Sequence, residues 1–149
     1  MTPQFHHRNL PHLLLHAREI LMSHFRPILN TASVTEQQWR VLRTLDESGS
    51  LEPNKISSIC QILRPSLTRM LADMEVAGLI KRARSLEDQR RQEISLTKKS
   101  RSLIARMRPA VDQKYAELEQ KIGKQLLERL YRDVDEALLR IQSDVEAKK

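Results

Sequence analysis

The chain has 149 residues, which is enough for one compact domain with a substantial hydrophobic core. Its formal net charge of +7 points to a polyanionic partner, while a total of only five Trp, Tyr and Phe residues argues against binding of single-stranded nucleic acid by base stacking. A single cysteine excludes an internal disulfide and no apolar run approaches the ~20 residues that cross a bilayer, so we expect a soluble protein of the reducing cytoplasm.

The first predicted helix begins after Asn9, whose side chain can cap it. Pro11 falls in the first turn, where a missing N–H is harmless, and Pro27 is expected to kink or end the helix near Arg26. The apolar residues recur at helical spacing: Leu10, Leu13, Leu14, Ala17, Leu21, Phe25 and Ile28.

Two shorter helices follow. Thr35 and Gln38 form the capping-box pattern of a second helix, and Trp39 lies at the edge of its apolar stripe, which consists of Val41, Leu42 and Leu45. A third helix begins near Pro53 and ends near Cys60. We expect Cys60 to be a small buried core residue rather than a redox sensor, because no second thiol is present to resolve an oxidised one.

A fourth helix is predicted from Pro65 to Ala77, with an inner face of Leu67, Met70, Leu71 and Met74. Its outer face is centred on Arg69, and small or polar residues surround that arginine: Pro65, Ser66, Thr68, Ala72 and Asp73. Such a face suits close approach to a DNA groove, and the alternative is an ordinary solvated surface.

Gly78 ends this helix, and the segment up to Thr97 reads as a short strand, a charged turn and a returning strand. Only Glu87 and Asp88 oppose its basic residues, which are Lys81, Arg82, Arg84, Arg90 and Arg91. We expect Asp88 to hold Arg90 at the tip by a charge-assisted hydrogen bond. A basic hairpin directly after a short helix is how a winged helix-turn-helix binds duplex DNA.

Two long helices complete the chain. Thr97 can cap the fifth, Pro109 is expected to bend it, and Gly123 separates it from the sixth. The sixth carries an apolar seam typical of a coiled-coil face, formed by Leu127, Leu130, Val134, Leu138, Ile141 and Val145. This seam predicts a two-fold dimer, and the alternative is a helical hairpin within one chain.

Taken in this order, the motifs resemble the MarR (multiple antibiotic resistance regulator) family of winged-helix repressors, and within it the regulators of hydroxylated aromatic acid degradation. The likeness covers nearly the whole chain. It rests on the segments Ala17–Glu19, Met22–Pro27, Thr35–Arg40, Ile62–Thr68, Asp88–Arg91 and Ile94–Thr97.

The resemblance implies one mainly α domain with a small β wing, in which residues 34–97 bind DNA and residues 9–31 and 98–146 dimerise. It implies a homodimer on a pseudo-palindromic operator. The DNA-binding residues that it implies are Arg64, Pro65, Ser66, Thr68 and Arg69 on the recognition helix and Asp88, Arg90 and Arg91 in the wing.

Such repressors usually bind a small aromatic acid between the dimerisation helices and the winged region. Trp39 offers an apolar surface for the ring, Arg18 or Arg43 offers a cation for the carboxylate, and His24 lies on the apolar stripe of the first helix. The alternative is that Trp39 is a core residue and the arginines are solvated.

No enzyme motif, cofactor motif or metal site is predicted. His12 and His16 have metal-ligand spacing but lack a nearby carboxylate or thiol cluster, so interface or solvent-facing histidines are expected. Two rival functions remain: a general phenol- or drug-responsive regulator of efflux or stress genes, and a helical scaffold that does not bind DNA.

Overall fold

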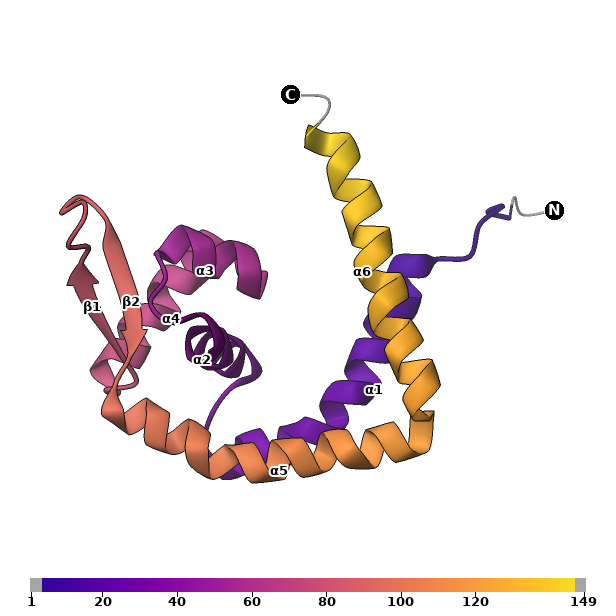
Figure 1. The fold of residues 1–149 in the computed structure, drawn as a ribbon, viewed down its shortest axis with the longest axis horizontal. Coiled ribbons are helices and arrows are strands. Elements are labelled where there is room, and N and C mark those ends of the chain that lie inside the picture. The colour runs from indigo at the N-terminus through magenta and orange to yellow at the C-terminus, as the bar shows by residue number, and fades with distance from the viewer. Residues whose placement is uncertain (1–3, 147–149) are drawn as a thin grey trace. The chain divides into compact units, whose positions relative to one another are not determined.

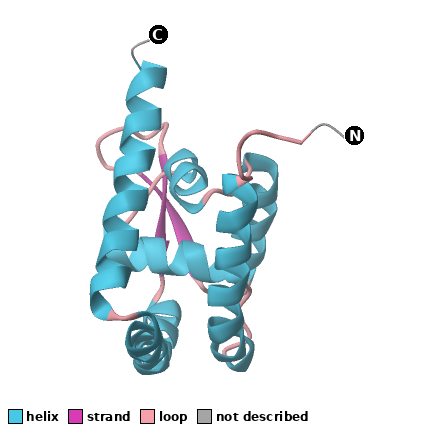
Figure 2. Cartoon of the chain, turned by 90° about the vertical axis from the view of Figure 1, so that its right-hand side faces the viewer, coloured by secondary structure: helices cyan, strands magenta, loops and turns pink. Residues whose placement is uncertain are grey.

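The computed structural model describes residues 4–146 (Figure 1). Within this range the chain is helical apart from one antiparallel pair of strands and short loops, as Figure 2 shows, which confirms the predicted fold class. The elements are α1 (Leu10–Thr31), α2 (Glu36–Ser48), α3 (Pro53–Cys60), α4 (Arg64–Val76), β1 (Ile80–Arg84), β2 (Gln92–Leu96), α5 (Lys98–Ile122) and α6 (Lys124–Glu146). They form two compact units, Met1–Ala110 and Val111–Lys149.

The predicted cap of α1 is confirmed. The Asn9 side chain accepts a hydrogen bond of 3.0 Å from the backbone N–H of His12. Pro27 does not end α1 near Arg26, because the helix continues to Thr31, and a kink at Pro27 stays a prediction. Proline removes only one backbone hydrogen bond, and the helix is held by burial of Phe25 and Leu29 on either side of it.

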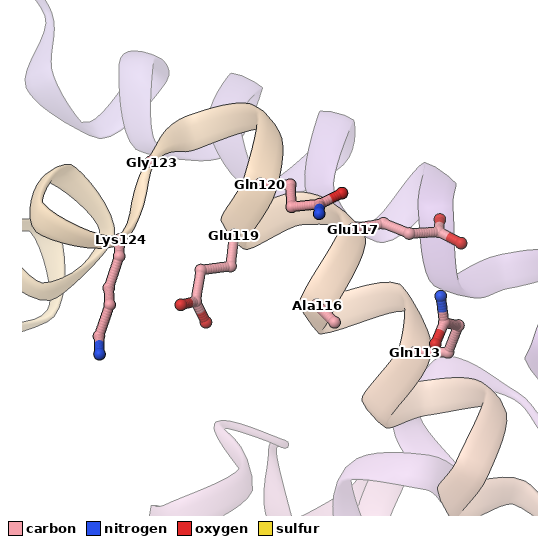
Figure 3. A pocket seen from close by; sticks show the side chains of 7 residues that line it. All are labelled: Gln113, Ala116, Glu117, Glu119, Gln120, Gly123 and Lys124. Atoms are coloured by element: carbon pink, nitrogen blue, oxygen red, sulfur yellow. The ribbon is translucent and has the colours of Figure 1, made fainter.

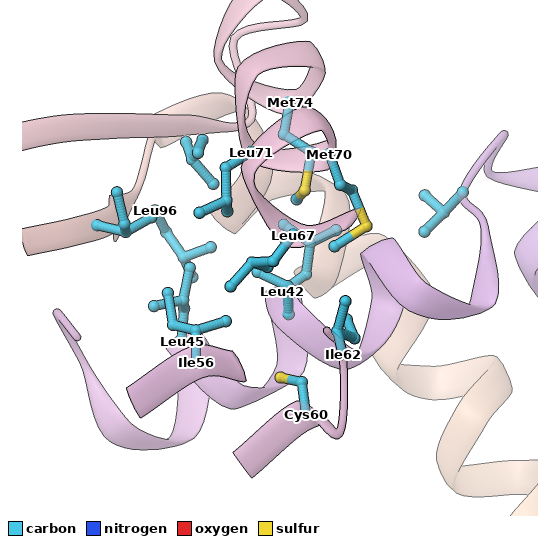
Figure 4. Close-up of a cluster of buried hydrophobic side chains, with 14 of the residues drawn as sticks. Leu42, Leu45, Ile56, Cys60, Ile62, Leu67, Met70, Leu71, Met74 and Leu96 are labelled. Carbon is cyan, nitrogen blue, oxygen red and sulfur yellow. The ribbon is translucent and has the colours of Figure 1, made fainter. Parts of the chain in front are cut away.

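The core of the first unit lies between α2, α3, α4 and the two strands. Figure 4 shows side chains from these elements converging, among them Leu42, Ile56, Leu67 and Met74, all of which are fully buried. The predicted inner faces of α2 and α4 are therefore confirmed. The apolar residues of each face recur every three or four positions, which places them on one side of the helix.

The predicted burial of Cys60 is also confirmed, since only 3% of this residue is exposed. Its thiol donates to Thr44 Oγ1 at 3.4 Å, and its carbonyl accepts a hydrogen bond of 2.7 Å from Arg40 Nη1. Cys60 thus ends α3 inside a network that connects α3 to α2. Gln61 follows in the left-handed conformation and turns the chain toward α4.

The two strands form the wing. They pair in antiparallel register from Ile80 opposite Leu96 to Arg84 opposite Gln92. The base of the wing is fixed on both sides by hydrogen bonds that sequence reasoning did not anticipate: Leu51 exchanges two backbone bonds with Ile94, of 3.0 and 2.8 Å, and Thr97 Oγ1 donates to the Gly78 carbonyl at 2.6 Å. Thr97 also caps α5, as predicted, by accepting a bond of 3.2 Å from the backbone N–H of Ser100.

The second unit consists of the end of α5 and all of α6, joined at Gly123. Gly123 has a φ of +91°, a conformation that favours glycine, and it ends α5 where the sequence predicted. Most large apolar side chains of α6 are exposed: Leu126, Leu130, Tyr131, Val134, Leu138, Leu139, Ile141 and Val145. Between residues 4 and 146, no helix combines the length and apolar character needed to cross a membrane.

Candidate nucleic-acid interface and effector region

The outer face of α4 is exposed, as predicted. Pro65, Ser66, Thr68 and Arg69 all face solvent, because the opposite side of the helix is buried in the core. Thr68 donates its hydroxyl to the carbonyl of Arg64 at 2.9 Å, so this side chain lies along the helix and stays close to the surface. Within residues 4–146, neither Arg64 nor Arg69 forms an ion pair, and both guanidinium groups are available to an external anion.

The wing tip places Arg90 in a tight turn between the strands. The backbone of Ser85 donates to the Arg91 carbonyl at 2.8 Å, and the backbone of Arg91 donates to the Asp88 carbonyl at 2.9 Å. Asp88 does hold Arg90, by accepting its backbone N–H at 3.0 Å. The predicted charge-assisted hydrogen bond is therefore confirmed: the carboxylate orders the turn at the tip, and residue Arg90 stays exposed.

A correction concerns the acidic residues that face the wing. Glu87 and Asp88 are not alone, because Glu93 also stands in the hairpin, on β2. Arg82 Nε lies 3.4 Å from Glu75 of α4, and Arg91 Nε lies 3.6 Å from Glu52. Glu52 and Glu75 precede the hairpin in sequence, and folding brings them to it. Arg91 is also 3.8 Å from Asp88, so it lies between two carboxylates.

Between the wing and the first turns of α3 and α4 lies a cleft of about 450 Å³. It contains three of the predicted DNA-binding residues, Arg64, Arg90 and Arg91, and two residues that the sequence did not single out as part of a site, Arg84 and Glu52. Alternate residues of a strand share a face, so Arg84 could have been expected on the same face of β1 as Arg82. The lining is completed by Pro53, Asn54, Gln89 and Gln92.

In the proposed effector region, the structure places Arg18 in a network of four charged side chains that joins α1 to α2. Arg18 Nη2 donates to Glu36 Oε2 at 3.0 Å, and Arg26 Nε donates to Glu36 Oε1 at 2.5 Å. Glu19 accepts from both arginines, at 3.1 and 2.7 Å. The network is partly exposed, so its contribution to stability is modest.

The network shifts the pKa values of two of its members, Glu36 and Arg26. The hydrogen bond from Arg26, reinforced by that from Arg18 and opposed by partial burial, holds the pKa of Glu36 below its ordinary value of 4.5. Hydrogen bonds to Glu19 and then to Glu36 raise the pKa of Arg26. Sequence reasoning missed Glu36, whose only local signal was an acidic residue in the first turn of a capped helix.

The remaining predicted effector residues lie near this junction along the helices. Trp39 is half-buried against the core and follows Glu36 by one turn of α2. Arg43 lies one turn further on, with Nε donating to Glu47 at 2.8 Å, and His24 is half-buried on α1. Glu36 therefore connects Arg18 to the α2 face that carries Trp39 and Arg43.

The second unit has a cleft of its own, of about 460 Å³, at the elbow between α5 and α6. Figure 3 shows Glu119 and Lys124 extending to the same side of the elbow. The other lining residues are Gln113, Ala116, Glu117, Gln120 and Gly123. None of the residues predicted to bind DNA or effector lies in this cleft.

Helix α3, its turn, the exposed helix α4 and the basic hairpin together define a winged helix-turn-helix protein. Comparison with known proteins gives the family: residues 34–91 match the MarR family. The chain is 40% identical to the homoprotocatechuate degradative operon repressor of Escherichia coli over 83% of its own length and 84% of that protein. This chain belongs to the MarR family of transcriptional regulators.

Solved structures agree with this assignment. The crystal structure of NadR in complex with 4-hydroxyphenylacetate superposes with a TM-score of 0.83 at 39% identity, over 92% of this chain and 97% of that one. The repressor CouR bound to a 23-mer DNA duplex superposes with a TM-score of 0.69 at 28% identity, over 92% of each chain. Both are similar to this chain along nearly its whole length.

Proposed function

We propose that this protein is a homodimeric, ligand-responsive repressor that binds a pseudo-palindromic operator and controls genes of aromatic acid catabolism. The observation that carries the proposal is the exposed face of α4, with Arg69 at its centre and no ion pair among the described residues, beside a wing whose tip presents Arg90. A recognition helix and an adjacent cationic hairpin can contact a groove and the neighbouring backbone at the same time. The similarity to CouR, whose solved structure is bound to a DNA duplex, supports this proposal.

The dimer is supported by apolar surface that the isolated chain leaves exposed. The side chains of Leu10, Leu14 and Leu15 on α1 are about half exposed, and α6 carries the longer apolar row described above. Exposed apolar rows on amphipathic helices are typical of a subunit interface. Two-fold pairing would present two recognition helices to half-sites one helical turn apart, as a pseudo-palindromic operator requires.

The proposed effector is a hydroxylated aromatic acid. The E. coli relative represses a homoprotocatechuate degradative operon, and NadR was crystallised with 4-hydroxyphenylacetate. In this chain, Trp39 can support the ring, and Arg18 or Arg43 can bind the carboxylate, with His24 nearby on α1. Each of these arginines already donates to a glutamate, so effector binding would have to share or replace an existing pair.

We expect a DNA-binding protein of the cytoplasm rather than an enzyme. A gel shift with the DNA upstream of its own gene tests the proposed repressor function. The protein should bind with sequence preference and strong salt dependence. Adding 4-hydroxyphenylacetate should change that affinity, because an effector shifts DNA binding when it prefers one dimer geometry. Sequence-specific binding that no aromatic acid alters would favour the phenol- or drug-responsive regulator. Absence of any DNA binding would favour the scaffold.

Fluorescence provides a second readout of the effector, because Trp39 is the only tryptophan. Binding of 4-hydroxyphenylacetate beside it should quench its emission, with an affinity of roughly micromolar to millimolar for so small a ligand. Replacing Arg18 and Arg43 together with alanine should abolish the quenching and leave DNA binding intact. Quenching that survives in this double variant would place the carboxylate elsewhere.

A further inference from the structure

The cleft between the wing and the first turns of α3 and α4 collects positive charge around one carboxylate. Four arginines line it, Arg64, Arg84, Arg90 and Arg91, against the single acidic residue Glu52. Of these four arginines, only Arg91 has an ion-pair partner among residues 4–146. Guanidinium groups that converge without counter-charges repel one another, so the cleft favours entry of an anion. Figure 1 shows the wing beside α3 and α4, the elements that border the cleft.

The position of Glu52 follows from the backbone. The two hydrogen bonds between Leu51 and Ile94 attach the segment before α3 to the wing, and Glu52 is the next residue. It occupies the N-cap of α3, where a side chain commonly accepts a backbone N–H, yet it makes no such bond. Its carboxylate instead lies 3.6 Å from Arg91 Nε. The side chain is therefore not needed to cap the helix.

We propose that this cleft receives one phosphate of the DNA backbone in each half-site, with Arg84 as a ligand alongside Arg64, and that Glu52 occupies the anion position in the free protein. On DNA binding, the phosphate replaces the Glu52 carboxylate as the partner of Arg91. Glu52 thereby acts as an internal competitor that weakens binding to every duplex. The inference rests on the proposed function, and it adds Arg84 and Glu52 to the DNA-binding machinery.

The chemistry of the lining matches a phosphodiester. Guanidinium groups donate in a planar fork that fits the oxygens of phosphate, and two of the lining arginines come from different elements, Arg84 from β1 and Arg64 from the start of α4. A contact of this kind carries no base information. It should therefore affect all duplexes alike, unlike a contact from the face of α4.

The test measures binding of the full-length protein to a random-sequence duplex of roughly 24 base pairs by fluorescence anisotropy over a range of NaCl concentrations. Arg84→Ala should weaken binding several-fold. It should also flatten the slope of log K against log[NaCl] by about 0.9 for each phosphate that the variant no longer neutralises, or about 1.8 for a dimer. Glu52→Gln should tighten binding several-fold, because it removes the competing charge and keeps the shape.

Two matched variants separate the cleft from general charge effects. Arg82→Ala removes the neighbouring arginine of the same strand face, which already pairs with Glu75, and should weaken binding less than Arg84→Ala. Glu47→Gln removes a glutamate paired with an arginine Nε on α2, outside the cleft, and should tighten binding less than Glu52→Gln. Circular dichroism should show the same helix content in all four variants.

The outcomes distinguish the two levels of the proposal. If the wild-type protein binds no duplex at any salt concentration, the proposed function itself fails. If the wild type binds but Arg84→Ala keeps its affinity and salt slope, the phosphate site is overturned while the function stands. If Glu52→Gln binds no tighter than Glu47→Gln, the competitor role of Glu52 is overturned.

Discussion

The two compact units of the chain differ in where their apolar side chains go. In residues 1–110, the inner faces of α2, α3 and α4 close over the wing strands, and Leu67 and Ile94 are fully buried. In residues 111–149, the apolar row of α6 stays exposed, with 49% of Leu138 accessible. The inner faces of α2, α3 and α4 are covered within one chain, whereas the apolar rows of α6 and of the start of α1 need another surface. Helical periodicity therefore predicts which face of a helix is apolar but not which molecule covers it.

The largest expected effect comes from removing the exposed helix. A chain that ends at Ile122 lacks the whole of α6 and should lose the dimer, because the apolar row is the proposed interface. The remnant should aggregate or melt at lower temperature, since dimerisation stabilises the folded protein by mass action. Sedimentation velocity measures the result, and a folded, stable dimer of the shortened chain would move the interface away from α6.

Two leucine substitutions sharpen the same comparison. Leu67→Ala opens a cavity in the closed core and should lower the free energy of unfolding by about 2–5 kcal/mol. Leu138→Ala should lower stability by an amount that grows as the protein is diluted, because its cost falls on association. Thermal unfolding at two protein concentrations distinguishes the effect of Leu67→Ala from that of Leu138→Ala. A Leu138→Ala effect that is the same at both concentrations would mean that this residue packs within its own chain.

Within the first unit, the face of α4 and the tip of the wing should behave differently. Arg69→Ala should cost about 1–3 kcal/mol of discrimination per half-site, so that specific binding falls toward the nonspecific level. Arg90→Ala is the contrasting variant, and it should weaken binding to all duplexes alike while flattening the salt dependence of that binding. Competition between operator and random DNA measures both. If Arg69→Ala lowers the affinity for operator and for random DNA equally, Arg69 contacts the backbone and not a base edge.

The smallest expected effect is the pH dependence of the junction between α1 and α2. The pKa of Glu36 is lowered in the folded protein, so its contribution to stability is present above the ordinary value of 4.5. That contribution is lost as the pH falls through the lower folded value. Glu36→Gln should therefore destabilise the protein slightly near neutral pH and flatten the decline of Tm below about pH 4.5. A variant whose Tm declines in acid as steeply as that of the wild type would show that the network carries no such linkage.

The features that could be predicted from sequence are those set by neighbouring residues. Thr35 and Gln38 form the reciprocal capping bonds of α2, both of 3.1 Å, and Gly49, Gly78 and Gly123 end helices with positive φ. These outcomes depend on backbone conformation over three or four residues. The same local reasoning was wrong about the end of α1 at Pro27, because burial of the flanking residues outweighs one missing hydrogen bond.

The parts of the site that escaped prediction join residues far apart in the chain. Glu36 pairs with Arg18 across 18 positions, and Glu52 approaches Arg91 only because Leu51 pairs with β2. No spacing rule connects such residues, since their proximity depends on how α1 and the wing pack. The residue types of the DNA-binding surface and the local partner Asp88 were therefore predictable, while the distant partners Glu52 and Glu75 of its arginines were not.

The central claim is that a closed winged unit reads DNA and that the exposed helices pair two such units. Footprinting of the dimer on the DNA upstream of its own gene tests it most directly. The account predicts two protected half-sites about 10 base pairs apart, both lost in Arg69→Ala and in the chain that ends at Ile122. A single protected half-site that persists when α6 is removed would contradict it.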